Sequence, residues 1–452
     1  MDKQLIRKYN VPGPRYTSYP TVPFWATTPT QEEWSNLVKE TFHATNTEEG
    51  ISVYIHLPYC SSLCTYCGCN KRITVNHAVE LPYIHSILKE WQLYLNLFEV
   101  APRIREIHLG GGTPTFFSPE NLKFLITELL RGCELCDDAQ LGLEGHPKNT
   151  TAQHLEVLYE LGFRRLSLGI QDFDEAVQKV INRVQPYEMV EMATETARAL
   201  GYTSVNFDLI YGLPLQTIDT VRKTIELVNQ LKPDRIAFYS YAHVPWQTPG
   251  QRSYSEKDLP NNEEKRALYE LGKEMFEELG YVEIGMDHFA VPSDSLTIAF
   301  NNRSLHRNFM GYTPVHDHLM IGLGASSISD SWTGFAQNIK KVEDYQKAVD
   351  SGEFPFYRGH VLSEQDLVLR RHILEIMCHF ETSWEEEEMQ NEVIFEGLTK
   401  LTELIEDGLV EVSETKLRVT DKGKPFVRNI CMCFDEYLFK KKSDTPIFSQ
   451  TI

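Results

Sequence analysis

The sequence lacks a long apolar run and any excess of positive charge. Its 452 residues are 42% hydrophobic and 24% charged, as in ordinary globular domains, and no stretch has the length and apolar character of a membrane span. Residues 1–9 carry charges where a secretory signal would be apolar. We therefore expect a cytoplasmic protein that does not insert into membranes.

Basic residues are scarce relative to acidic ones. Lys and Arg number 44 against 64 Asp and Glu, which gives a net charge of -20. A chain of this charge repels a phosphate backbone, so nucleic acid is not an expected partner. A small acidic ligand is still compatible, because a few cations inside a pocket act at short range while distant surface charges are screened.

Alternating strand and helix patterns fill the middle of the chain. Apolar, β-branched runs at 51–56, 106–109, 141–144, 165–170, 204–210 and 235–239 alternate with amphipathic stretches at 81–98, 119–130, 151–161, 187–200 and 218–231. Repeated βα units predict an α/β fold with parallel strands, here a partial (βα)6 TIM-like barrel. A doubly wound open sheet is the alternative, and both folds place their chemistry at the carboxyl ends of the strands.

Two flanking regions are expected to differ from this core. Residues 1–50 form an N-terminal arm, 51–355 the barrel with the active-site segments that follow it, and 356–452 a mainly helical C-terminal domain. A helix over 398–409 followed by strands at 410–412 and 417–419 predicts a winged-helix-like unit. Such units often bind DNA, but the acidic composition favours a packing module or lid.

Three of the nine cysteines form a motif directly after the first predicted strand. Cys60, Cys64 and Cys67 have C-x3-C-x2-C spacing, with Cys69 just beyond them. Thiols clustered in this way indicate metal or redox chemistry rather than disulfides. Three thiolates can hold three irons of a [4Fe–4S] cluster and leave the fourth open to a small chelating ligand. A zinc site made by all four thiols is the alternative, disfavoured because they crowd into ten residues.

Further polar and glycine residues follow the other strands. Gly110–Gly112, before Thr113, let a ligand approach the backbone, and Glu144, Gln171, Asp208 and, slightly farther on, Arg183 follow later strands. Carboxylates suit ribose hydroxyls or an amino group, and a guanidinium suits a carboxylate. Capping or surface roles are the alternative for each residue taken singly.

With these motifs assembled, the chain resembles the oxygen-independent coproporphyrinogen III oxidases, a family of radical S-adenosylmethionine (SAM) enzymes. The resemblance runs nearly end to end, through the cysteine loop and the segments 13–20, 169–173, 206–214, 241–245, 285–290, 305–309 and 428–434. It implies oxidative decarboxylation of two propionates of coproporphyrinogen III to vinyl groups by a 5′-deoxyadenosyl radical, giving protoporphyrinogen IX in haem synthesis.

The same resemblance implies the cofactors and their residues. A [4Fe–4S] cluster on Cys60, Cys64 and Cys67 and two SAM molecules are expected. The residues expected at the SAM molecule on the cluster are Tyr54, Tyr66, Gly111, Glu144 and Ile328. Those expected at the second SAM molecule are Gly112, Thr113, Gln171, Arg183, Asp208 and Ala242. A monomer and a low-potential electron donor, flavodoxin- or ferredoxin-like, are expected as well.

Coverage of the barrel mouth is expected, because the radical must be shielded from water. Arg15 in the arm is a candidate clamp for a substrate carboxylate, with a salt bridge that merely anchors the arm as the alternative. Two positions depart from the family pattern: His146 stands where a small polar or acidic residue is usual, and Lys148 where Arg is expected.

Two other functions are alternatives to the oxidase. A haem chaperone, a non-catalytic relative, shares the cluster motif but typically lacks Cys69 and the arm motif at 15–20, both of which are present here. A nucleic-acid-modifying radical enzyme is disfavoured by the net charge of -20.

Overall fold

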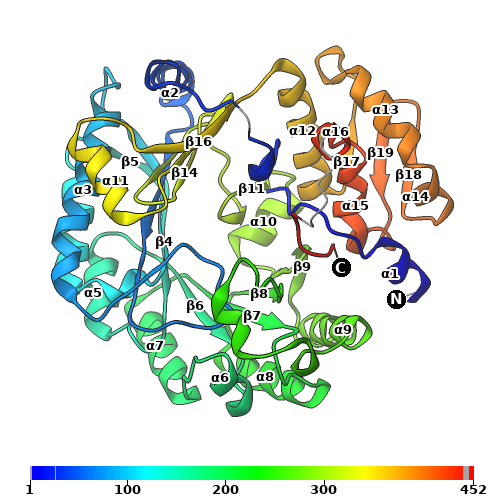
Figure 1. Ribbon diagram of the computed structural model, residues 1–452, viewed down its shortest axis with the longest axis horizontal. Coiled ribbons are helices and arrows are strands. Elements are labelled where there is room, and N and C mark those ends of the chain that lie inside the picture. Colours follow the sequence, from blue (N-terminus) through cyan, green and yellow to red (C-terminus); the bar gives the residue numbers. More distant parts are fainter. Residues whose placement is uncertain (1–2, 26, 441–446, 452) are drawn as a thin grey trace.

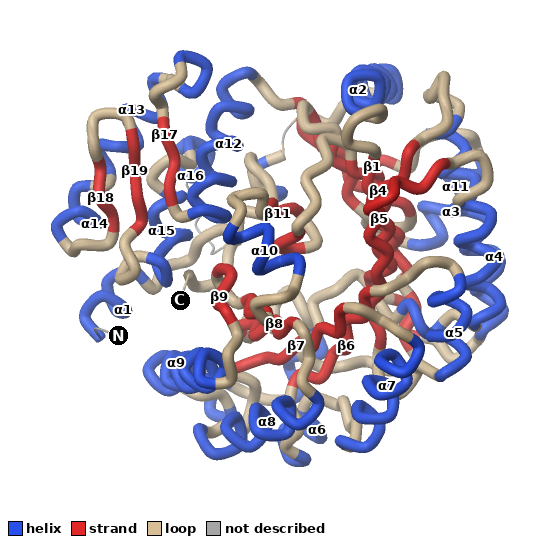
Figure 2. Tube along the Cα trace, turned by 180° about the vertical axis from the view of Figure 1, so that it is seen from behind, coloured by secondary structure: helices blue, strands red, loops and turns tan. Residues whose placement is uncertain are grey.

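A single curved sheet organises the chain in the computed structural model, which describes residues 3–25, 27–440 and 447–451. Its parallel part follows chain order through β1 (Ile51–Leu57), β4 (Arg103–Gly111), β5 (Glu134–Gly145), β6 (Arg165–Gln171), β7 (Ser204–Tyr211) and β8 (Arg235–Ser240). All six predicted strands are confirmed. Figure 2 shows them curving around an interior, with helices on the outside.

The strand order decides between the two predicted folds. Each of these strands pairs with the next one in the chain, so the order never reverses as it does in a doubly wound sheet. β13 (Met320–Leu323) adds a seventh parallel strand beside β1, and the sheet ends openly at β16 (Phe356–Val361) and β9 (Val282–Gly285). The partial barrel is therefore confirmed.

Helices cover the convex face of the sheet (Figure 1). They are α3 (Glu80–Leu95), α4 (Pro119–Leu129), α5 (Ala152–Glu160), α7 (Tyr187–Leu200) and α8 (Ile218–Leu231). In α8 the hydroxyl of Thr217 accepts the first-turn N–H of Thr220 at 3.3 Å, and Val221, Ile225 and Val228 are buried on one face. The helices therefore form where the apolar spacing predicts them.

The arm and the C-terminal region share a second core. Leu5, Tyr9, Tyr16 and Tyr19 pack with buried residues of α12 (Glu364–His379) and α15 (Val427–Met432). By contrast α2 (Gln31–Thr45) buries its apolar face in the main core beside the barrel. The first 50 residues therefore contribute to both cores.

The predicted hairpin near the C-terminus is present, with one correction. β18 (Val410–Val412) pairs with β19 (Lys416–Val419), and β17 (Glu381–Ser383) adds a third strand. The single helix expected over 398–409 is wrong: the segment forms α13 (Glu392–Lys400) and α14 (Thr402–Glu406), which meet at the fully buried Leu401. In the described part of the chain no helix combines the length and apolar character needed to cross a bilayer.

Candidate active site at the mouth of the barrel

The cysteine loop leaves the carboxyl end of β1 and is held against a short surface strand. β2 (Tyr59–Cys60) pairs in parallel with β3 (Arg72–Ile73), and the Thr74 N–H donates to the Cys60 carbonyl at 2.9 Å. Cys64 is buried, Cys60 and Cys67 are half-buried, and all three are free thiols. The loop therefore presents three unpaired sulfurs from a fixed backbone.

The three sulfurs have different surroundings. The Thr113 hydroxyl donates to Cys60 Sγ at 3.3 Å, and Arg183 Nη1 lies 3.5 Å from Cys64 Sγ. Burial nevertheless raises the pKa of the Cys60 thiol. A hydrogen bond from the Cys69 thiol, with Lys71 and Arg183 nearby, lowers the pKa of Cys67, and the same hydrogen bond raises the pKa of Cys69. Within this pair the surroundings therefore favour the thiolate at Cys67.

The three thiols of the loop could bind metal in two ways. Zinc requires its ligands to converge on one centre. In a [4Fe–4S] cluster each thiolate binds a different iron, so the ligands can stay farther apart.

The glycines after β4 lie where side chains would collide with the cysteine loop and its neighbours. A Cβ on Gly111, whose φ is +114°, would lie 2.8 Å from the His56 ring, and one on Gly112 would lie 2.6 Å from the Pro58 carbonyl oxygen and 3.1 Å from Cys60 Sγ. Packing against the cysteine loop therefore explains both glycines, and the approach of a ligand to this backbone stays a prediction.

The residues expected at the SAM molecule on the cluster fall into two neighbouring sets. Glu144 Oε2 accepts the Gly111 N–H at 3.3 Å, and the Tyr54 ring stacks on His108, which lies 3.5 Å from the Glu144 carboxylate. Ile328 lies two strands from Tyr54, on β14 (Ile328–Asp330), and its carbonyl packs on Gly322 of β13, the residue that pairs with Tyr54. Tyr54, Gly111 and Glu144 therefore form one connected group, with Ile328 farther along the same sheet.

Tyr66 is linked to Ala242 through the side chain of Gln251. The side-chain amide of Gln251 donates to both carbonyls, at 3.1 Å each. Tyr66 also packs against a small apolar cluster that includes Tyr241 and Tyr254. Gln251 was missed from the sequence, since a glutamine 185 residues away in an irregular segment gives no periodic signal.

The remaining predicted residues surround the next two strand ends. Arg183 donates to the Gly169 carbonyl at 2.6 Å, and Gln171, at φ +67°, turns its amide toward the same glycine. Asp208 accepts from Ser167 at 3.1 Å and Asn206 at 2.8 Å. Burial, with Glu144 nearby, raises the pKa of Asp208 to about 6.

A polar cavity joins the two groups inside the barrel. It measures about 110 Å³ and is lined by both Glu144 and Asp208, with His108, Asn206 and Tyr239 between them. The structure therefore brings the acidic residues of β5 and β7 to one interior space, although Asp208 lies within β7 rather than at its predicted position at the strand end.

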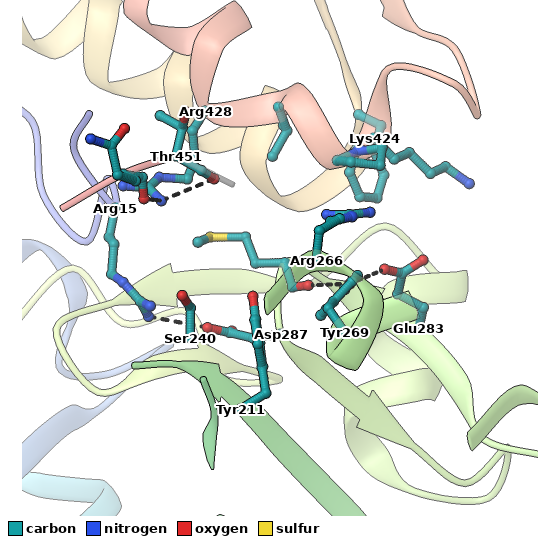
Figure 3. A pocket seen from close by; sticks show the side chains of 15 residues that line it. Arg15, Tyr211, Ser240, Arg266, Tyr269, Glu283, Asp287, Lys424, Arg428 and Thr451 are labelled. Atoms are coloured by element: carbon teal, nitrogen blue, oxygen red, sulfur yellow. Dashed lines mark hydrogen bonds and ion pairs between the residues drawn. The ribbon is translucent and has the colours of Figure 1, made fainter. Parts of the chain in front are cut away.

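Arg15 is already paired. Its guanidinium donates to Asp287 at 3.1 Å, while its own carbonyl accepts from Arg307. Figure 3 shows this pair beside a cavity of about 60 Å³ between the arm, the end of the barrel and the C-terminal domain. Burial alone would raise the pKa of the Asp287 carboxyl. His288 has the largest opposing effect, followed by Arg15 and Arg307, and together they lower this pKa below its usual value. This geometry fits an arm anchor, and the role as a substrate clamp stays a prediction.

Comparisons with known proteins agree with this arrangement. The sequence profile of the Radical SAM superfamily matches residues 54–228. The oxygen-independent coproporphyrinogen III oxidase of Pseudomonas aeruginosa is 38% identical over 97% of this chain and 96% of its own length. The Escherichia coli protein of that name is 37% identical over 100% and 98%. A solved structure, described as E. coli coproporphyrinogen III oxidase and a radical SAM enzyme, superposes with a TM-score of 0.90 at 36% identity, covering 97% of this chain and 99% of that one.

Proposed function

The chain belongs to the oxygen-independent coproporphyrinogen III oxidases, and on that premise we propose that it oxidatively decarboxylates two propionate side chains of coproporphyrinogen III to vinyl groups. The products are protoporphyrinogen IX and CO2. One observation supports this assignment: relatives of that name match from end to end, and the cysteine loop of this chain carries three free thiols, with the Cys60 sulfur beside Gly112.

The cofactors are a [4Fe–4S] cluster and SAM. When bound, the cluster supplies the electron that cleaves the sulfonium bond of SAM to give the 5′-deoxyadenosyl radical. Cys60, Cys64 and Cys67 would hold the cluster, and Arg183 would place a positive charge beside the Cys64 sulfur. Gly112 keeps the space beside the Cys60 sulfur free of a side chain.

Two SAM sites are part of the proposal. Tyr54, Tyr66, Gly111, Glu144 and Ile328 would bind the first, and Gly112, Thr113, Gln171, Arg183, Asp208 and Ala242 the second. The support is their placement: Glu144 and Asp208 share a cavity, and Tyr66 and Ala242 share one amide donor. Carboxylates in these positions suit the ribose hydroxyls and ammonium group of the ligand.

The arm over 1–50, the barrel region over 51–355 and the C-terminal domain over 356–452 are proposed to act together in shielding the radical from water. The Arg15–Asp287 pair supports this, because it joins the arm to the barrel. We further propose that the chain acts as a monomer in the cytoplasm, where its nine free thiols stay reduced, and that a low-potential flavodoxin- or ferredoxin-like protein reduces it.

Turnover under anaerobic conditions tests the function. Chain reconstituted with iron and sulfide, then given SAM, dithionite and coproporphyrinogen III, should release two CO2 per substrate and form protoporphyrinogen IX. Omission of SAM is the control that should abolish both products. Stable haem binding without turnover would instead identify a haem chaperone.

A further inference from the structure

A patch of cations surrounds the outer side of the cysteine loop, although the chain as a whole has a net charge of -20. We define the basic patch as Lys71, Arg72, Lys340, Lys341 and Arg358. Arg72 pairs with Glu343 at 2.9 Å and Lys341 with Asp344 at 3.3 Å. Five cations against two carboxylates leave the patch positively charged.

Two cations of the patch, Lys340 and Arg358, lie near the same aromatic ring. Lys340 lies 5.4 Å and Arg358 5.6 Å from the centre of the Tyr357 ring. Burial, and then the Arg358 charge, lower the pKa of Lys340. Like charges held together at a surface destabilise the fold, so their presence favours a role in binding.

The patch is linked directly to two proposed cluster ligands. Lys71 Nζ donates to the Cys67 carbonyl at 2.8 Å, and the Thr74 N–H donates to the Cys60 carbonyl. The Asn70 side chain donates to the Lys340 carbonyl at 2.9 Å, which joins the cysteine loop to the second half of the patch. Residues 70–74 therefore join the cysteine loop to the exposed basic patch.

Apolar side chains give this surface the character of a protein contact. Ile73 pairs with Cys60 across the β2–β3 ladder and is 42% exposed, while Val75 is 77% and Tyr357 56% exposed. A groove of about 430 Å³ runs beside them, between residues 72–79 and α11 (Val342–Asp350). An apolar centre with a charged rim is the usual anatomy of a protein interface.

We propose that the basic patch docks an acidic, low-potential flavin or iron–sulfur protein that delivers electrons to the cluster. The inference rests on the proposed function, in which every SAM cleavage consumes one electron. In the transfer the donor loses one electron and the cluster gains one, with no atom moved. The positive charge selects an acidic donor, and the hydrogen bonds from Lys71 to the Cys67 carbonyl and from Thr74 to the Cys60 carbonyl keep this surface next to the proposed cluster ligands.

The test compares two charge reversals of equal size. Lys340→Glu/Lys341→Glu reverses two exposed patch residues, of which Lys341 makes no capping hydrogen bond to α11. Arg222→Glu/Lys223→Glu makes the same change on exposed residues of α8, on the opposite side of the molecule from α11 and β16 (Figure 1). The probe is an acidic flavodoxin, mixed with the reconstituted chain without SAM or coproporphyrinogen.

Two readouts do not depend on turnover: flavodoxin affinity by fluorescence anisotropy, and the stopped-flow oxidation rate of its hydroquinone. At low salt, the affinity and the rate should both fall about tenfold or more in the patch variant and stay near wild type in the α8 variant. Near 1 M salt, the patch variant and the wild type should give similar values, because salt screens the charges. Equal values in all three chains, or equal losses in both variants, would overturn the proposal. Dithionite-driven turnover by the wild type separately tests the oxidase function.

Discussion

Gly112→Ala should weaken cluster binding while leaving the fold intact. The new Cβ would lie 2.6 Å from the Pro58 carbonyl oxygen and 3.1 Å from Cys60 Sγ. A separation below 3.0 Å forces movement, and the atom in the way is backbone of the cysteine loop rather than a flexible side chain. Overpacking of this kind costs about 1–3 kcal/mol. If that cost acts against the bound loop conformation, cluster affinity falls about 5- to 150-fold.

Gly68→Ala is the matched control. Gly68 lies in the same loop, next to Cys67, but a Cβ there would have no neighbour within 4 Å. Both variants should be reconstituted in parallel, with iron and sulfide content measured after desalting and thermal unfolding followed on the apo chains. The reasoning is refuted if Gly112→Ala keeps wild-type iron, or if Gly68→Ala loses as much.

Three further predictions concern single residues. Cys64→Ser should abolish iron binding, whereas Cys69→Ser should spare it because Cys69 lies outside the C-x3-C-x2-C motif; equal iron loss in both would contradict this division. Asp208 has a pKa of 3.8 in the unfolded chain and about 6 in the folded chain. Between these pH values the folded chain binds more protons, so the free energy of unfolding falls as the pH rises. The total fall is at most about 3 kcal/mol. Asp208→Asn should therefore flatten the decline of the unfolding midpoint from pH 4 to pH 7, and an unchanged slope would count against a buried carboxyl. Arg15→Gln removes the ion pair with Asp287, which at its partial exposure stabilises the arm by about 1–2 kcal/mol. Hydrogen exchange over residues 5–19 should increase at constant iron content, whereas a raised substrate KM without faster exchange would make Arg15 a clamp.

Local patterns were sufficient to predict the repeating part of the fold. In each βα unit the strand is apolar and β-branched and the helix has one apolar face, so neighbouring residues alone specify both elements. The candidate site follows from the same logic, because residues after consecutive parallel strands meet at one edge. Glu144, near the end of β5, follows this rule, whereas Asp208 lies within β7 and lines the same cavity from inside the barrel.

Long-range pairing was not predictable in the same way. β13 is only four residues long, and it joins the sheet because Ser52 pairs with Met320, with 267 residues between them. A short apolar run does not indicate which edge of the sheet it will join. The contacts of Arg183 with Cys64 and of Gln251 with Tyr66 also join residues far apart in sequence, and they depend on how loops fold over the finished sheet.

His146, which is expected to depart from the family pattern, is kept neutral by its surroundings. Burial, Arg183 and Lys148 together lower the pKa of His146 to about 3, so its imidazole is neutral at any pH near neutrality. Its Nδ1 accepts the Lys148 N–H at 3.1 Å, which also leaves no proton on that nitrogen. An acidic residue at this position would attract the Arg183 guanidinium away from Cys64. A neutral histidine does not attract the guanidinium in this way. Arg183 therefore keeps its positive charge beside Cys64, one of the sulfurs that the cluster requires as thiolates.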